Sequence, residues 1–114
     1  MKLKNIFAIL TILVCTLLEI TYKNKKIKDV CQNYTNAVKA YGENIAEKIH
    51  LRVMQIEAAE SVEFMMAHNI GRCHKLRNNR KGEYAVDLAH PYRLVFEVKG
   101  EEIEIAKILE VVDY

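Results

Sequence analysis

The spacing of apolar residues changes at Gly71, and no other feature of the sequence limits the possible folds as much. Before this glycine, apolar side chains recur at three- and four-residue steps, which is the period of one face of an α-helix. After it they alternate with polar side chains, and turn residues recur at short intervals, as in antiparallel strands. The pattern predicts an α+β domain in which two N-terminal helices pack on one face of a small, mainly antiparallel twisted sheet.

Two amphipathic helices are expected before Gly71, joined as an antiparallel hairpin. The first spans Asn24 to Tyr41 and ends at Gly42, the second spans Glu43 to about Ala59, and Ser61 can cap a further short helical turn. Their apolar stripes, which we assign to the core, are Ile27, Val30, Cys31, Tyr34, Val38 and Tyr41 in the first helix and Ile45, Ile49, Val53 and Ile56 in the second. The polar residues left for solvent on the second helix are Glu47, Lys48, Arg52 and Glu57.

Five strands are expected, one before the first helix and the others after Gly71. They lie near Glu19–Tyr22, Arg72–Arg77, Glu83–Leu88, Tyr92–Val98 and Glu102–Val112. In the fourth strand, alternation places Tyr92, Leu94, Phe96 and Val98 on the face that the helices must cover. Arg93 then points to the opposite, open face of the sheet.

The composition favours one compact domain without a structural metal. The chain has 114 residues, about half of them apolar, with one proline and four glycines. Its three cysteines, Cys15, Cys31 and Cys73, are widely spaced and lack the close Cys and His pairs of a zinc site. Cys73 and His74 are adjacent, but neighbours on a strand point to opposite faces. We therefore expect a reducing, cytoplasmic location and no metal or cofactor.

Residues 1–17 are interpreted as an apolar extension ahead of a domain that spans residues 18–114. The apolar run from Ile6 to Leu18 follows two lysines, as in a secretory signal, but no small-residue cleavage site follows it. It is also shorter than the roughly 20 residues of a membrane-spanning helix. Three interpretations stay open: a signal, a membrane anchor over residues 6–18, or an over-extended gene start, with Leu18 encoded by an alternative start codon.

The formal net charge of +2 conceals a local excess of positive charge in the predicted hairpin. Between Gly71 and Gly82 there is no acidic residue, and the basic residues are Arg72, Lys75, Arg77, Arg80 and Lys81. Together with Arg93, and with Tyr84 or Tyr114 for base stacking, they would give the open face the groups that bind single-stranded RNA. The alternative is that these residues only keep a small domain soluble.

His74 adds a group that can exchange a proton near neutral pH. Metal-free RNA cleavage needs a base to take the proton of a ribose 2′-hydroxyl and cations to stabilise the phosphorane. His74 is the candidate base or acid, and Arg93 is a candidate phosphate ligand. His90, in the turn before Pro91, is expected to be structural.

Several segments with ordered spacing resemble one family of proteins. They are His74-Lys-Leu-Arg-Asn-Asn-Arg-Lys-Gly, Tyr84-Ala-Val-Asp-Leu, His90-Pro-Tyr-Arg-Leu-Val-Phe and the terminal Val-Val-Asp-Tyr. Over about residues 18–114 the chain resembles the RelE/ParE superfamily of type II toxins, and within it the HigB-like or proteic killer group. The resemblance implies a RelE-like fold and a ribosome-dependent endonuclease that inhibits translation by cutting mRNA in the ribosomal A site. It also implies a cognate antitoxin, often of helix-turn-helix type, through which any operator DNA is bound.

The resemblance further implies a catalytic set. His74 matches a catalytic histidine, Arg77 a catalytic lysine, and Arg93 the arginine that stabilises the scissile phosphate. Asp113 and Tyr114 match the first two residues of a C-terminal Asp-Tyr-His group. Arg80 matches a loop arginine for which the family suggests RNA contact. The sequence departs from the family at two positions. Arg77 lacks the compact ammonium of lysine. The histidine expected after Tyr114 is missing, and this absence predicts either a clipped end or slower cleavage that depends on His74.

Two other functions are compatible with this superfamily. A ParE-like inhibitor of gyrase would act through protein contacts and would not need His74 and Arg93 in one pocket. A catalytically degenerate toxin would persist as a corepressor bound to its antitoxin. The histidine in the basic hairpin favours the nuclease.

Overall fold

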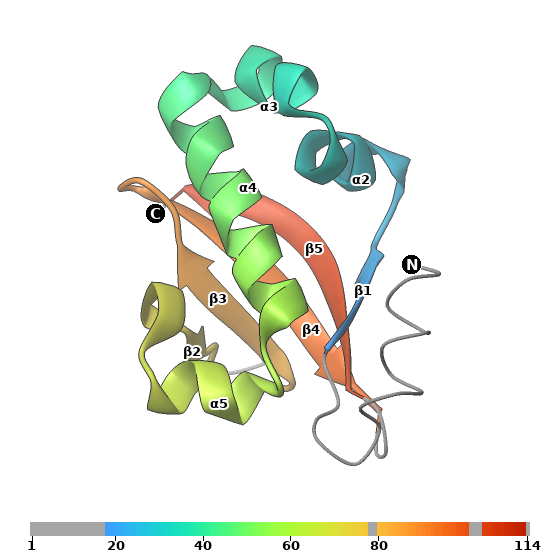
Figure 1. Cartoon of the computed structure of the whole chain (residues 1–114), viewed down its shortest axis with the longest axis vertical. Coiled ribbons are helices and arrows are strands. Elements are labelled where there is room, and N and C mark those ends of the chain that lie inside the picture. Colours follow the sequence, from blue (N-terminus) through green and yellow to red (C-terminus); the bar gives the residue numbers. More distant parts are fainter. Residues whose placement is uncertain (1–17, 78–79, 101–103, 114) are drawn as a thin grey trace.

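The computed structural model describes residues 18–77, 80–100 and 104–113, and it has two layers (Figure 1). One layer is a five-stranded sheet with the strand order β1-β5-β4-β3-β2, and the helices α2 to α5 form the other. The predicted α+β class, with helices on one face of the sheet, is confirmed. The predicted extension over residues 1–17 and Tyr114 lie outside the described residues. Among the helices of the described segments, none combines the length and the apolar character needed to cross a membrane.

The sheet is antiparallel except at one edge. β1 (Glu19–Tyr22) runs parallel to β5 (Ile105–Asp113), whereas β5, β4 (Tyr92–Lys99), β3 (Glu83–Asp87) and β2 (His74–Lys75) pair in antiparallel fashion. The predicted strands are confirmed with shifted ends, apart from β2, which is much shorter than predicted. A mainly antiparallel sheet allows one face to pack on helices while the other stays uncovered by them.

The predicted first helix is in fact two helices, because Asn33 interrupts it. α2 (Lys25–Gln32) ends and α3 (Tyr34–Tyr41) begins at Asn33, whose side-chain Oδ1 accepts the backbone N–H of Asn36 at 3.1 Å. Asparagine side chains compete for backbone hydrogen bonds and therefore favour helix caps over helix interiors. The break leaves Tyr34 45% exposed, so its predicted place in the core is wrong.

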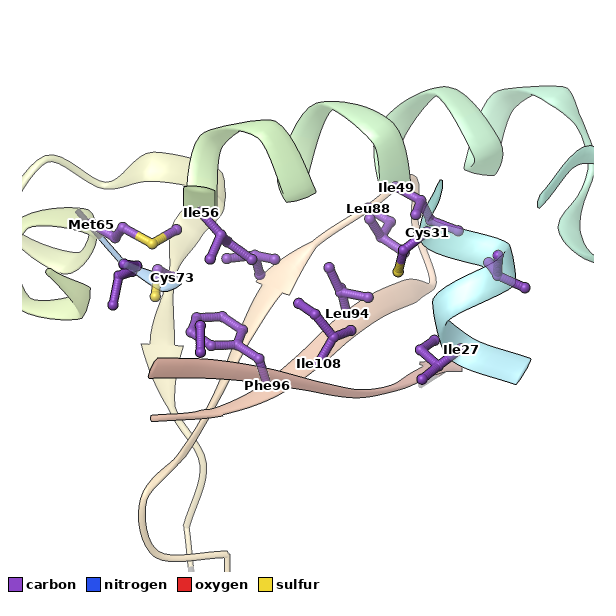
Figure 2. Packing of buried hydrophobic residues seen from close by; sticks show 14 of the residues in the cluster. Ile27, Cys31, Ile49, Ile56, Met65, Cys73, Leu88, Leu94, Phe96 and Ile108 are labelled. Atoms are coloured by element: carbon purple, nitrogen blue, oxygen red, sulfur yellow. The ribbon is translucent and has the colours of Figure 1, made fainter. Parts of the chain in front are cut away.

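α4 (Glu43–Ala58) lies across the sheet and supplies the centre of the core (Figure 2). Ile49 and Ile56 of this helix pack above Leu94, Phe96 and Ile108, and each of the five is at most 1% exposed. The predicted apolar stripe of this helix is therefore confirmed. The ends of the core are closed by Ile27 and Cys31 of α2 and, beside α5 (Val62–Ala67), by Met65 and Cys73.

The pairing of β3 with β4 decides which side chains share the open face. Val86 pairs with Leu94, and both lie in the core beneath the helices. Paired residues share a face and neighbours along a strand alternate. The next pair, Asp87 with Arg93, therefore lies on the open face, as the alternation predicts for Arg93.

Candidate functional site

Three arginines from separate elements converge on Asp87 at one end of the open face. Arg72 donates from Nε and Nη2 to the Asp87 carboxylate, at 2.6 and 3.2 Å, and Arg93 approaches the same carboxylate with Nε at 3.3 Å. Arg52 of α4 donates from Nε to the Asp87 backbone carbonyl at 2.6 Å. The prediction that the Arg52 side chain is left for solvent is therefore wrong. Sequence reasoning missed Asp87, because one acidic residue in an alternating strand gives no signal of its own.

Arg72 reaches Asp87 from an uncommon backbone conformation. Its φ is 52°, in the left-handed region, directly after Gly71 at φ 59°. Glycine adopts this region freely, whereas for arginine it costs on the order of 1–3 kcal/mol. The two residues belong to a 3₁₀ turn, η1 (Ile70–Arg72), so the prediction that Arg72 begins a strand is wrong. The reason is this left-handed turn, which delays the extended backbone until His74.

His74 joins the same network through its imidazole ring. It begins β2 and pairs with Ala85, which places it on the open face, about 7 Å along β3 from Asp87. Its Nδ1 lies 2.8 Å from the backbone carbonyl oxygen of Arg72. Because a carbonyl only accepts hydrogen bonds, Nδ1 carries the proton and Nε2 is the acceptor of the neutral ring. His74 can therefore take a proton from a ligand on the open face.

A small cleft of about 100 Å³ opens beside the arginines. It is lined by Arg72, Asp87, Leu88, His90, Pro91, Tyr92 and Arg93. Clefts that enclose a whole small molecule measure roughly 300–1,000 Å³, so this one takes a single group such as a phosphate. His90, expected to be only structural, is exposed and lines the cleft.

The hairpin arginine Arg80 lies at the other end of β3 and is bound by carboxylates of its own. It pairs with Glu83 of β3 at 2.7 Å and with Glu110 of β5 at 2.8 Å. These strands flank β4, so the guanidinium crosses β4, where Val95 is fully buried although it faces away from the helices. Glu83 and Asp87, at the two ends of β3, are about 13 Å apart. The open face is therefore mixed in charge and not uniformly cationic as predicted.

Two other predicted RNA-binding residues lie on the helix side of the sheet. Lys75 pairs with Tyr84, whose ring stacks on Phe96 with centroids 5.9 Å apart. Burial raises the pKa of the Tyr84 hydroxyl. The prediction that Tyr84 offers a stacking surface on the open face is wrong, because Ala85 and not Tyr84 shares the face of His74.

The remaining predicted site residues have fewer contacts. Arg77 and Lys81 are exposed in the hairpin, and neither side chain forms a hydrogen bond or ion pair with another residue of the described segments. Asp113 ends β5 opposite Tyr92, one residue beyond the partner of Arg93. It therefore lies at the same end of the sheet as the Asp87 network, but on the helix side together with Tyr92.

No protein-family profile and no curated protein matches the chain, but solved structures do. A YoeB/ParE toxin from Agrobacterium tumefaciens superposes with a TM-score of 0.59 over 85% of this chain and 99% of its own, at 11% identity. The YoeB–YefM complex from Staphylococcus aureus gives a TM-score of 0.55 at 25% identity, covering 85% of this chain and 95% of the matched one. The YoeB dimer from Staphylococcus aureus gives 0.50 at 22% identity with the same coverage, 85% and 95%.

These neighbours are toxins, and the superpositions cover nearly their whole length. The fold that the sequence resemblance implied is therefore confirmed at the level of the superfamily. The chain therefore has the fold of the RelE/ParE superfamily of toxins.

Proposed function

We propose that the chain is the toxin of a type II toxin–antitoxin system, of the HigB-like kind, and that it inhibits translation by cutting mRNA in the ribosomal A site. One observation carries the proposal: His74, Arg72, Asp87 and Arg93 form a continuous chain of contacts on the open face. These contacts bring a proton acceptor and two guanidinium groups together, beside a cleft that takes one phosphate. These are the groups that a 2′-hydroxyl attack on a phosphodiester requires.

In the proposed reaction, the ribose 2′-hydroxyl gives its proton to Nε2 of His74. O2′ forms a bond to the adjacent phosphorus and the bond from phosphorus to O5′ breaks, which leaves a 2′,3′-cyclic phosphate. The departing O5′ takes a proton from water and becomes the 5′-hydroxyl, and His74 later returns its proton to the solvent. Negative charge grows on the non-bridging oxygens, where Arg93 and Arg72 donate charge-assisted hydrogen bonds. For Asp113 we propose a place near the leaving oxygen, together with Tyr114, on the strength of the family resemblance.

We propose a second role for the cations of the hairpin. Arg77 and Lys81 are exposed and would contact RNA phosphates outside the cleavage step. Arg80 is engaged by Glu83 and Glu110, so its role is to support the hairpin. Lys75 would add positive charge from the edge strand.

We also propose a cognate antitoxin, of helix-turn-helix type as the resemblance implies, with operator DNA bound only through it. The structure of YoeB in complex with YefM supports an antitoxin partner for the present chain, whereas the helix-turn-helix type rests on the resemblance alone. Copurification of the chain with the product of a neighbouring gene, and loss of its toxicity on coexpression, would test this partner.

Primer extension on cellular mRNA after brief induction of the full chain tests the nuclease. New cuts within translated frames are expected from the wild type and should disappear in Arg93→Ala and in His74→Ala. Lys99→Ala is the matched control, because Lys99 is an exposed cation on the same strand, at its far end.

The pattern of results separates the candidate functions. Growth arrest without cuts, together with altered DNA supercoiling, would replace the nuclease by a gyrase inhibitor. Operator binding without any arrest would identify a degenerate corepressor. Cuts that persist in Arg93→Ala would remove Arg93 from the site.

A further inference from the structure

We infer that Asp87 is a positioning residue: it holds Arg72 beside Arg93 and so builds a site in which two guanidinium groups bind one phosphate at the cleft. The identity of the natural ligand, an RNA phosphodiester, rests on the proposed function. The geometry of the site does not depend on it.

The Asp87 carboxylate keeps Arg72 in place. Its side chain is 55% exposed, and its only hydrogen bonds to described residues are those to the Asp87 carboxylate. Arg72 and Arg93 carry like charges, and they approach the same carboxylate. Without that carboxylate, repulsion and the rotational freedom of a long side chain would move Arg72 into solvent. Asp87 thus converts a mobile surface arginine into a fixed group.

The donors and the net charge of the three side chains both suit a phosphodiester. A guanidinium has N–H donors along two edges and at its end, and Asp87 occupies the edge formed by Nε and Nη2 of Arg72. Nη1 of Arg72 is left to donate elsewhere. Two guanidinium groups and one carboxylate carry a net charge of one positive unit, which matches the single negative charge of a phosphodiester. The cleft lined by all three residues has room for that group.

The backbone on both sides of the contact is also fixed. Arg72 stands in the left-handed region, and such outliers persist where the surrounding structure over-determines them, often at ligand sites. On the other side of Asp87, Arg52 fixes its backbone carbonyl and lies against Gly71, where a Cβ would come within 3.0 Å of Arg52 Nε. The residue that holds the arginines is therefore itself held on two sides.

The experiment is a titration of the full chain with inorganic phosphate, followed by NMR of the Nε–Hε groups of Arg72 and Arg93. Both resonances are expected to shift in the wild type. Asp87→Asn and Arg72→Ala should each weaken phosphate binding by about tenfold, the order expected for losing a hydrogen bond to a charged group. The double variant should bind no more weakly than either single variant, because both changes remove the same contact.

Two further variants separate positioning from charge and from folding. Glu83→Gln removes a carboxylate from the same strand but at the Arg80 end, so it changes the net charge equally without touching the cleft. It should leave phosphate binding unchanged. Asp87→Glu keeps the carboxylate on a longer stem and should restore part of the binding that Asp87→Asn loses.

Several outcomes would overturn the inference. Tighter phosphate binding by Asp87→Asn than by Glu83→Gln would make Asp87 a competitor of the ligand. Equal binding by Asp87→Asn and wild type would leave it a purely structural residue, and no shift in the wild type would remove the site. The proposed function fails separately: phosphate binding that depends on Asp87, without mRNA cuts, would sustain the inference and reject the nuclease.

Discussion

The arginines of the open face and the lysines at the sheet edge are both cationic, but only the arginines are fixed in place. Arg72, Arg80 and Arg93 each pair with a carboxylate. Between the end of β1 and the last turn of α2, exposed lysines occupy positions 23, 25, 26 and 28, and none forms an ion pair with another described residue. Two of them stand in the first turn of α2, where the helix dipole disfavours positive charge.

The two kinds of cation are suited to different tasks. A guanidinium held by a carboxylate offers its donors in one direction and can select a ligand by geometry. An unpaired lysine contributes mainly to the electrostatic field around the molecule, which speeds the approach of an anionic partner. We therefore expect the arginine network to control the chemical step, and the lysine edge, residues 23–28, to control only association.

The largest expected effect comes from replacing a fixed arginine by lysine. Arg93→Lys keeps the charge but loses the planar fork, and we expect ribosome-dependent cleavage to fall by about 10²–10³-fold, as when a positioned donor to a transition state is removed. Single-turnover cleavage of a translated reporter mRNA measures this. The matched change on the lysine edge, Lys26→Arg, should alter the rate by less than about threefold. Near-wild-type cleavage by Arg93→Lys would show that the chemical step does not need a fixed guanidinium at this position.

A smaller effect is expected from the turn that supports the network. Gly71→Ala places a Cβ at positive φ and against Arg52, whereas Gly82→Ala has positive φ with nothing within 4 Å. Each should lower the free energy of unfolding by about 1 kcal/mol for the backbone conformation, with about 1 kcal/mol more at Gly71 for the contact. Urea denaturation measures both losses, and only Gly71→Ala should also slow cleavage. Equal losses in the two variants would show that the Arg52 side chain moves away from the new methyl group without lowering the free energy of unfolding.

Alkaline pH is expected to weaken the fold before it affects the arginines. Burial raises the pKa of the Cys31 thiol to about 12 and that of the Cys73 thiol to about 11. Unfolded thiols ionise near pH 8.5, so above that pH the unfolded state loses protons that the folded state keeps, and stability falls as pH rises. We expect a loss of about 1–2 kcal/mol by pH 10 after allowance for solvent screening.

Urea denaturation at pH 7.5, 9 and 10 tests this dependence. Cys31→Ala should be less stable at pH 7.5 but should show a shallower decline, because one of the two thiols no longer ionises on unfolding. Phosphate binding at the cleft should stay constant between pH 7.5 and 9, where arginines remain charged. A stability that does not change up to pH 10 would contradict the burial of the thiols.

The smallest effect belongs to the lysine edge. Changing its four lysines to glutamine should reduce cleavage by less than about threefold at moderate salt. It should also make ribosome binding less dependent on salt. The slope of the logarithm of the binding constant against the logarithm of the salt concentration should become shallower by up to about 0.7 for each RNA phosphate that a lysine no longer neutralises. Binding measured from 50 to 300 mM salt would show it. A loss as large as that of Arg93→Lys would mean that the lysines also act in the chemical step.

The fold was predictable where burial leaves a regular pattern in the sequence. The stripe of α4 and the alternation in β4 identify the layers, because the apolar side chains at those positions are buried in the core or pack against it. The break at Asn33 was not predictable from that pattern, since α2 and α3 both bury residues at helical spacing on either side of it. Only the capping preference of asparagine pointed to it.

The candidate site was predictable only in part. His74 and Arg93 share a face because strand alternation places both of them there, and alternation is visible in the sequence. The convergence of Arg52 and Arg72 on Asp87 depends on a left-handed turn and on how α4 lies over the sheet. Neither property leaves a hydrophobic pattern. The aromatic ring of Tyr84 suggests base stacking, but the strand pairing places this ring on the helix side of the sheet.

The parallel pairing of β1 with β5 also bears on when the protein folds. β1 pairs along its whole length with a strand that the ribosome synthesises much later. Until β5 emerges, β1 has no neighbour in the sheet, and the apolar faces of the first helices lack the strand that carries Ile108. A protein proposed to attack translating ribosomes is therefore expected to lack its complete fold, and to be inactive toward the ribosome making it, until β5 has been synthesised.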